Sequence, residues 1–108
     1  MINIYWIFIL FHFHVLGKEG EEVTLSVKYN DGATTTWIYE GRVIDTGDMN
    51  NNNYELHSEF EHTTGKTIEK LIIKQVQKNG QGIYTVEVKQ EGCKSSETIY
   101  VSLKWINS

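Results

Sequence analysis

Apolar and polar residues alternate along most of the chain after residue 17. Between residues 22 and 28, Val23, Leu25 and Val27 fill every second position, which predicts a strand with one buried face and one solvated face. The same period of two returns in three later stretches, residues 54–60, 82–89 and 98–103. Clusters of Gly, Asn and Asp separate these stretches, as turns do between strands. The pattern therefore predicts an all-β chain.

Another strand is predicted between two turns. Residues 34–39 are β-branched and aromatic throughout, which favours a strand. The turn signal Asn30-Asp31-Gly32 precedes this stretch, and Tyr39-Glu40-Gly41-Arg42 follows it as a tight turn.

A polar loop opens the second half of the chain. Residues 46–53 end in four consecutive asparagines, which predicts a solvated loop. After the strand over 54–60, residues 62–65 form a turn signal. Three apolar residues beyond it are expected to point inward: Leu71, Ile73 and Val76.

Length, charge and cysteine content narrow the possible functions. The chain has 108 residues, enough for one domain to bury a core without several disulfides or a metal. Its formal net charge is -4 and its basic residues form no stripe, which argues against nucleic acid as a partner. The single cysteine, Cys93, cannot form an internal disulfide, so packing holds the domain together and a reducing compartment is favoured.

Residues 1–17 form an apolar leader, for which three interpretations stay open. If the run is a signal peptide, cleavage would follow Gly17. However, the run lacks a positively charged N-terminal region and an Ala-x-Ala pattern of small residues. A transmembrane helix needs about 20 residues, and two histidines interrupt this shorter run. Alternatively, the run is a translated non-coding segment, because the pyrimidine-rich end of an intron encodes these residue types. We expect one domain over 18–104 and a tail over 105–108.

Residues 71–86 carry a resemblance to a known family. Their sequence Leu-Ile-Ile-Lys-Gln-Val-Gln-Lys-Asn-Gly-Gln-Gly-Ile-Tyr-Thr-Val resembles the E strand, turn and F strand of an immunoglobulin-like domain of the I-set type. The resemblance implies a sandwich of two antiparallel sheets. Tyr84 then occupies the tyrosine corner, where a phenol bonds back to nearby backbone, and Trp37 is the C-strand tryptophan of the core.

The disulfide that bridges strands B and F in most such domains is absent here. The resemblance places Val27 and Val86 at its two positions, and two valines can fill the space of a cystine. The loss of roughly 2–4 kcal/mol of cross-link stabilisation has no consequence in a reducing interior, where domains of titin, myosin-binding protein C and myomesin tolerate it. Gly80 replaces the usual Asp before the corner tyrosine, which favours the I-set over the variable class. The implied core is Val27, Trp37, Leu71, Ile73, Tyr84 and Val86.

No catalytic or ligand-binding motif appears in the sequence. It has no phosphate-binding glycine loop, no nucleophile elbow and no paired cysteines, so we expect neither an enzyme nor a cofactor nor a small-molecule substrate. One histidine pair and an acidic cluster are interpreted as solvated surface: His57 and His62, and Glu19, Glu21 and Glu22. His12 and His14 of the leader have no further ligand cluster beside them, so no metal site is expected there.

Two functions remain. The first is a structural, protein-binding module of an intracellular sarcomeric or cytoskeletal immunoglobulin-repeat protein, whose partners are neighbouring domains or filament proteins. The second is a secreted or cell-surface adhesion or immune receptor fragment, which makes contact with a membrane only if the leader is a genuine signal or anchor. For either, the outward residues Thr85, Glu87 and Lys89 of the predicted F strand form a possible protein-contact face.

Overall fold

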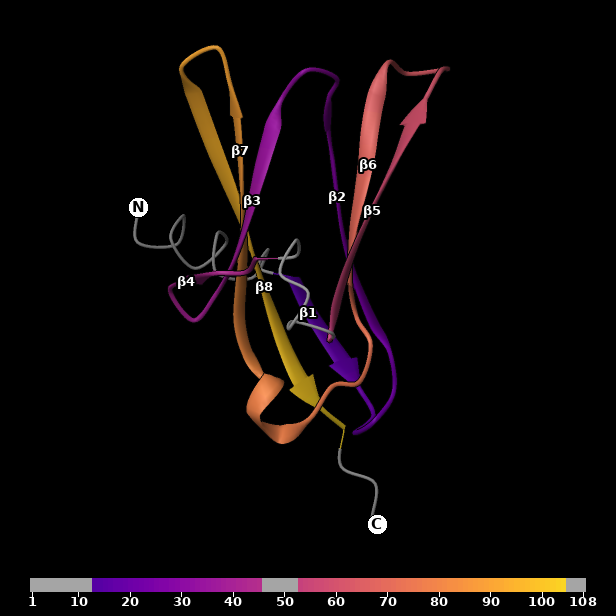
Figure 1. Ribbon diagram of the computed structural model, residues 1–108, viewed down its shortest axis with the longest axis vertical. Helices are drawn as coiled ribbons and strands as arrows, with labels where there is room; N and C mark the ends of the chain where they lie inside the picture. The colour runs from indigo at the N-terminus through magenta and orange to yellow at the C-terminus, as the bar shows by residue number, and fades with distance from the viewer. Residues whose placement is uncertain (1–12, 46–52, 105–108) are drawn as a thin grey trace, which may run out of the picture.

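The computed structural model describes residues 13–45 and 53–104, which form two β-sheets packed as a sandwich (Figure 1). The predicted loop over 46–53 lies outside the described residues except for Asn53, and the predicted tail over 105–108 lies outside them entirely. In chain order the elements are β1 Phe13–Gly17, β2 Val23–Asn30, β3 Thr34–Tyr39, β4 Arg42–Val43, β5 Tyr54–Glu61, β6 Lys66–Ile73, a short 3-10 helix η1 Lys78–Gly80, β7 Gly82–Gln90 and β8 Cys93–Leu103.

One sheet has five strands in the order β1-β8-β7-β3-β4, and the other has three in the order β2-β6-β5. The β7–β8 hairpin, the β2–β3 turn and the β5–β6 hairpin lie together at one end of the molecule, at the top of Figure 1. Helix η1 and the turn between β1 and β2 lie at the other end. The all-β class predicted from the alternation of residues is confirmed, and so is the two-sheet sandwich that the resemblance implied.

The structure places residues 13–17 inside the domain, although the sequence assigned them to a leader. They form β1, which runs parallel to β8 from the Phe13–Ile99 pair to the Gly17–Leu103 pair. Val15 packs against the core, and the carbonyl oxygen of Gly17 accepts the amide N–H of Lys104 at 2.7 Å. The sandwich thus starts before residue 18, and its larger sheet contains one parallel pair. Residues 1–12 lie outside the described residues, so the interpretations of the leader are not tested there.

The inward positions of both sheets build one core. The side chains implied by the sequence lie in it: Val27 and Trp37 are 4% and 3% exposed, and Leu71, Ile73, Tyr84 and Val86 are at most 1% exposed. The register explains their proximity within each sheet, because Trp37 pairs with Val86 and Leu25 pairs with Leu71. The strand boundaries differ from the expected ones chiefly in β8, which begins at Cys93 because its pairing with β7 continues to the Gln90–Cys93 pair.

Tyr84 fixes the turn between β6 and β7. Its hydroxyl donates to the carbonyl oxygen of Gly80 at 3.0 Å, which is the bond that the resemblance implied. Its ring lies 4.5 Å from the ring of Tyr39 between centroids, and the Tyr39 hydroxyl donates to the carbonyl oxygen of Gln81 at 2.5 Å. Two phenols therefore hold the backbone around η1 against the five-stranded sheet.

Candidate functional site

A buried carboxyl group lies between the two sheets. Glu69 of β6 is 4% exposed, and its register partner on β2 is Val27. Its Oε2 accepts the indole N–H of Trp37 at 2.7 Å and the hydroxyl of Thr35 at 2.5 Å, and its Oε1 accepts the hydroxyl of Tyr29 at 2.8 Å. These four residues are called the Glu69 cluster below. Three donors offset the cost of removing this carboxyl group from water.

The sequence analysis missed Glu69, although two signals were available. Every second residue of a strand points to the same face. On β6 this places Glu69 on the same face as Leu71 and Ile73, which are inward. In addition, a buried tryptophan requires an acceptor for its indole N–H. The buried polar atoms of the cluster are satisfied by one another, so the cluster positions Trp37.

The Glu69 cluster has a consequence at alkaline pH. Burial, reinforced by the hydrogen bond to Glu69, raises the pKa of Tyr29 from 10.0 to about 12. Because the folded state favours the neutral phenol, this contribution to stability is complete below the unfolded pKa and is lost as pH rises through the folded pKa. Burial, followed by the hydrogen bond to Tyr54, raises the pKa of Tyr84 in the same direction.

We therefore expect the free energy of unfolding to fall between about pH 10 and about pH 12. Urea unfolding followed at several pH values measures it, and Tyr29→Phe is the comparison because it removes the raised phenol. The fall should be shallower in Tyr29→Phe than in the natural sequence. A natural chain whose stability stays constant over this interval would contradict the assignment.

The outer face of the five-stranded sheet carries the predicted contact residues. Thr85 and Glu87 are half-buried on β7, and Lys89 is exposed on the same strand. Glu87 pairs with Lys94 of β8 across 3.6 Å. The three residues thus share one face, but the two charged ones lie toward the β7–β8 hairpin, where Lys89 pairs with Lys94. Their role in protein contact remains a prediction.

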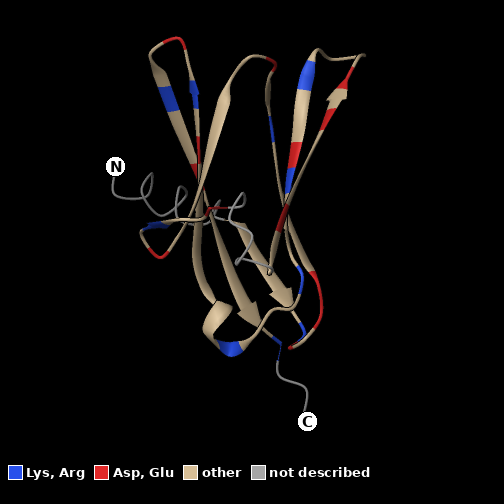
Figure 2. Cartoon of the chain, in the orientation of Figure 1, with Lys and Arg blue, Asp and Glu red and all other residues tan. Residues whose placement is uncertain are grey.

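A diagonal strip of apolar side chains crosses this same face. Leu16, Tyr100, Ile83 and Val43 are 60%, 49%, 41% and 67% exposed, and Ile38, which pairs with Val43, is half-buried. These five residues, one from each strand of the sheet, are called the apolar band below. Tyr100 pairs with Ile83, and the His14 ring lies edge-on to Tyr100 at 5.6 Å between centroids. The adjoining stretches 82–86 and 98–103 contain no charged residue, as Figure 2 shows.

The sequence analysis did not single out the apolar band. The signal that could have revealed it is a strand with apolar residues at both inward and outward positions. Ile83 is outward because it precedes the inward Tyr84, and Ile38 is outward because it follows the inward Trp37. In a sheet with one solvated face, the outward positions are expected to be polar. An apolar outward row is therefore the departure that indicates a second covered face.

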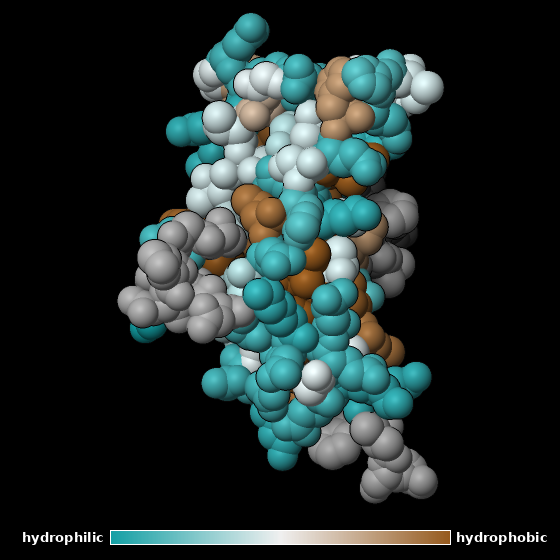
Figure 3. Space-filling view, turned by 45° about the vertical axis from the view of Figure 1, so that its right-hand side comes forward, coloured by the Kyte–Doolittle hydropathy of each residue, from teal (hydrophilic) through white to brown (hydrophobic). Residues whose placement is uncertain are grey.

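Apolar side chains also gather in the middle of the surface when the β5–β6 side is turned forward (Figure 3). On β5, Leu56 and Phe60 are 38% and 43% exposed, although their pairing with Leu71 and Thr67 turns them toward the other sheet. They lie on β5, one of the two edge strands of its sheet. Their exposure matches that of Ile83 and Tyr100, which makes them suitable controls.

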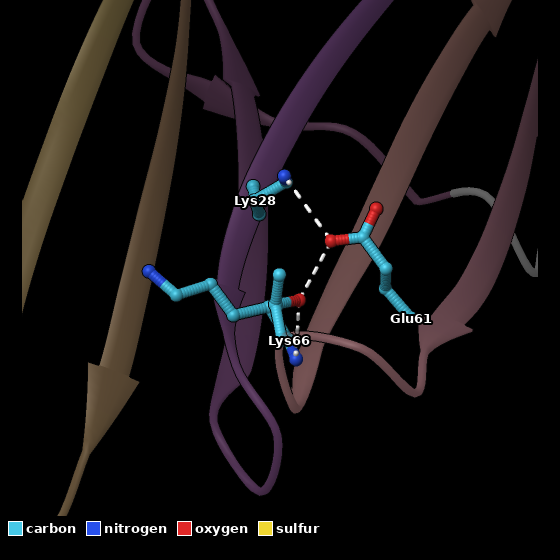
Figure 4. A network of polar contacts seen from close by, with 4 residues as sticks. Lys28, Glu61 and Lys66 are labelled. Carbon is cyan, nitrogen blue, oxygen red and sulfur yellow. Dashed lines mark hydrogen bonds and ion pairs between the residues drawn. The ribbon is translucent and has the colours of Figure 1, made fainter.

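Charged residues near the β5–β6 hairpin form a surface network without catalytic geometry (Figure 4). Glu61 accepts the Thr64 hydroxyl at 2.6 Å and the ammonium group of Lys28 at 3.3 Å, and Thr64 accepts the amide N–H of Lys66 at 3.3 Å. The Thr64 hydrogen bond, followed by that of Lys28, lowers the pKa of Glu61. The network ties the hairpin to β2.

The other polar residues considered from the sequence lie apart from one another. The imidazole of His57 bonds to Glu55 at 2.8 Å, whereas the His62 ring packs edge-on against Phe60. His14 bonds to the Ser102 hydroxyl, and Cys93 is an exposed thiol at the start of β8. Across residues 13–45 and 53–104, no group of three or more His, Cys, Asp or Glu could hold a metal ion. No helix in these ranges is long and apolar enough to cross a membrane.

Solved structures with the same arrangement of strands are numerous. Titin domain M7 superposes with a TM-score of 0.67 and 21% identity, and the match covers 85% of this chain and 86% of that one. The chain has an immunoglobulin-like fold. The first immunoglobulin domain of Dpr11, in a structure where it is bound to DIP-gamma, matches with a TM-score of 0.68 and 20% identity over 84% and 97% of the two chains.

A third immunoglobulin-like match comes from an adhesion molecule. The eight N-terminal immunoglobulin domains of Down Syndrome Cell Adhesion Molecule match with a TM-score of 0.70 and 19% identity, over 84% of this chain and 11% of that one. By sequence, no family model and no curated protein matches the chain. At such low identities the likeness is one of fold, and it includes the titin-type domains that the resemblance indicated.

Proposed function

We propose that the chain is a non-enzymatic protein-binding module within a series of immunoglobulin-like repeats, and that its contact surface is the outer face of the five-stranded sheet. The observation that carries this proposal is the apolar band. Contiguous apolar surface on a soluble domain marks a binding site, because water-exposed hydrocarbon is otherwise costly. The band crosses all five strands, and the stretches of β7 and β8 that adjoin it, residues 82–86 and 98–103, contain no charged residue. Few charged residues are found at the centre of protein interfaces.

The proposed setting is the interior of the cell, in a sarcomeric or cytoskeletal protein. Two observations support it: the domain packs Val27 and Val86 where a disulfide would otherwise be, and its one cysteine is free. The titin domain M7, which has the same fold, comes from a protein of repeated immunoglobulin domains. The partners would then be neighbouring repeats or filament proteins.

The alternative is a module of a secreted or cell-surface receptor. It is favoured by the matches to an adhesion molecule and to Dpr11. In that setting the same outer face would bind another surface protein. Processing after Gly17 would remove β1 from the sandwich.

Site-specific photo-crosslinking tests the proposed surface in cells that produce the protein. A benzophenone amino acid replaces Tyr100 in the apolar band, and a matched variant carries it at Phe60 on the three-stranded sheet. We expect position 100 to capture repeat or filament proteins and position 60 to capture far less. Equal capture at both positions, or none at position 100, would reject the outer face as the binding surface.

The cellular setting has its own readout. Mass spectrometry of the mature N-terminus, in cell extract and in medium, reports where the protein goes and whether it is processed. An intracellular module is expected in the extract. Processed protein recovered from the medium would instead establish the receptor alternative.

A further inference from the structure

The turn between β6 and β7 contains a chemically reactive pair of residues. Asn79-Gly80 is the one Asn-Gly pair in the sequence, and it lies in η1. We infer that this pair is a site of self-modification, which hydrogen bonds keep closed in the folded domain and which opens when two tyrosines release the turn. The modification is the loss of ammonia from the Asn79 side chain. The inference is independent of the proposed binding surface.

The reaction needs only these two residues and water. The backbone nitrogen of Gly80 attacks the side-chain amide carbon of Asn79 and gives up its proton, ammonia leaves, and a five-membered imide remains. Water then opens the imide at either carbonyl group, which gives aspartate or isoaspartate at position 79. Glycine favours the attack because it has no Cβ atom to hinder its nitrogen. Asn79 is exposed, so water reaches the imide.

The fold keeps both reacting groups out of position. The Gly80 N–H donates to the carbonyl oxygen of Gln77 at 2.8 Å, so the attacking nitrogen is engaged. Ring closure also requires the Gly80 nitrogen to eclipse the Cβ atom of Asn79 about the bond between Cα and the carbonyl carbon. The helical backbone of η1 holds these two atoms far from eclipsed. Deamidation therefore requires η1 to open.

Two phenols keep η1 closed. The Tyr39 hydroxyl donates to the carbonyl oxygen of Asn79 at 2.7 Å. The Tyr84 hydroxyl donates to the carbonyl oxygen of Gly80 at 3.0 Å. These bonds anchor the two peptide groups that must rotate before the ring can close. Because η1 contains no buried residue, its opening is local and costs less free energy than unfolding of the sandwich.

The product cannot rebuild the same turn. Isoaspartate routes the backbone through the side chain of residue 79, which adds one methylene carbon to the main chain. The carbonyl groups that follow it then no longer match the positions of the Tyr39 and Tyr84 hydroxyls. The change is permanent, so the amount of isoaspartate at position 79 reports how often the turn has opened.

Mass spectrometry with peptide mapping tests the inference on the whole chain, incubated for weeks at neutral pH. Deamidation at residue 79 should be at least about tenfold slower in the folded chain than in the chain unfolded by guanidinium chloride. Tyr39→Phe should accelerate it about fivefold or more in the folded chain, since losing one ordinary hydrogen bond raises the open population by that factor. Tyr100→Phe, which removes a phenol hydroxyl from the outer face of the sheet, should leave the rate unchanged.

Hydrogen exchange of the natural chain provides a second measurement, which does not depend on any variant folding. The protection of the Gly80 amide should match the factor by which folding slows deamidation, because both report the same open state. Equal deamidation in the folded and unfolded chain overturns the inference, and so does slow deamidation beside a Gly80 amide that exchanges freely. Equal acceleration by Tyr39→Phe and Tyr100→Phe also overturns it, because the bond to η1 would then have no special effect.

Discussion

Replacing Glu69 by alanine is expected to lower the free energy of unfolding by about 3–5 kcal/mol. The substitution removes the shared acceptor of the Glu69 cluster and leaves the indole N–H of Trp37 and the hydroxyls of Thr35 and Tyr29 without it. An unpaired buried donor costs about 1–3 kcal/mol. Trp37 is 3% exposed, so its indole N–H has no recourse to solvent. Urea unfolding measures the change as a lower midpoint at constant m-value.

Two comparisons identify the cause of this loss. Glu69→Gln keeps one acceptor oxygen and the same shape, so it should lose much less stability than Glu69→Ala. Glu59→Ala changes an exposed glutamate on neighbouring β5 and should stay within about 0.5 kcal/mol of the natural chain. If Glu69→Ala also stayed within that range, the carboxyl group would not be the acceptor on which the core depends.

The sequence was sufficient to predict the parts of the fold that obey a simple period. Val23, Leu25 and Val27 alternate with polar residues, and they lie in the core because one face of β2 is buried. Tyr84 and Trp37 could be placed through the family pattern that surrounds them. These predictions succeed because local alternation and the burial of one sheet face are the same physical constraint.

The features that were not predicted are positions where the residue type differs from what the alternation leads one to expect: a charged residue at an inward position, or apolar residues at outward positions. Glu69 occupies an inward position, but a carboxyl group there is acceptable only because three donors from β2 and β3 converge on it, and that convergence depends on packing of the two sheets. Ile38 and Ile83 occupy outward positions, and their joining into one band depends on strand order across the sheet. Neither arrangement is local in sequence.

Residues 13–17 were assigned to the leader for a related reason. An apolar run without polar alternation is compatible with a signal peptide, a membrane segment or a strand, and its period does not distinguish them. Residues 13–17 are a strand because β8 offers a parallel partner for them, five positions in register. The partner lies more than eighty residues away, with Val15 opposite Val101, so local pattern could not identify it.

Gly17→Val is expected to destabilise the domain by about 2–3 kcal/mol, because β1 is seated directly on the core at this residue. A Cβ atom at position 17 would lie 2.6 Å from Cγ2 of Val23 and 3.4 Å from Cγ1 of Val76. Val23 and Val76 are 4% and 0% exposed, so neither can move aside without disturbing the core. A larger side chain must therefore push β1 away from it.

Gly80→Ala is the matched control for that substitution, and thermal or urea unfolding compares the two. A Cβ atom at position 80 would meet Val76 and the Tyr84 hydroxyl at 3.7 and 3.8 Å, which are ordinary contact distances. This change should be neutral or stabilise by about 0.5 kcal/mol, because alanine restricts the unfolded chain. If Gly17→Val were as stable as Gly80→Ala, residue 17 would not be packed against the core, and the boundary at residue 18 expected from the sequence would stand. A clear loss in Gly17→Val alone would show that the strand beginning at Phe13 is part of the folded domain.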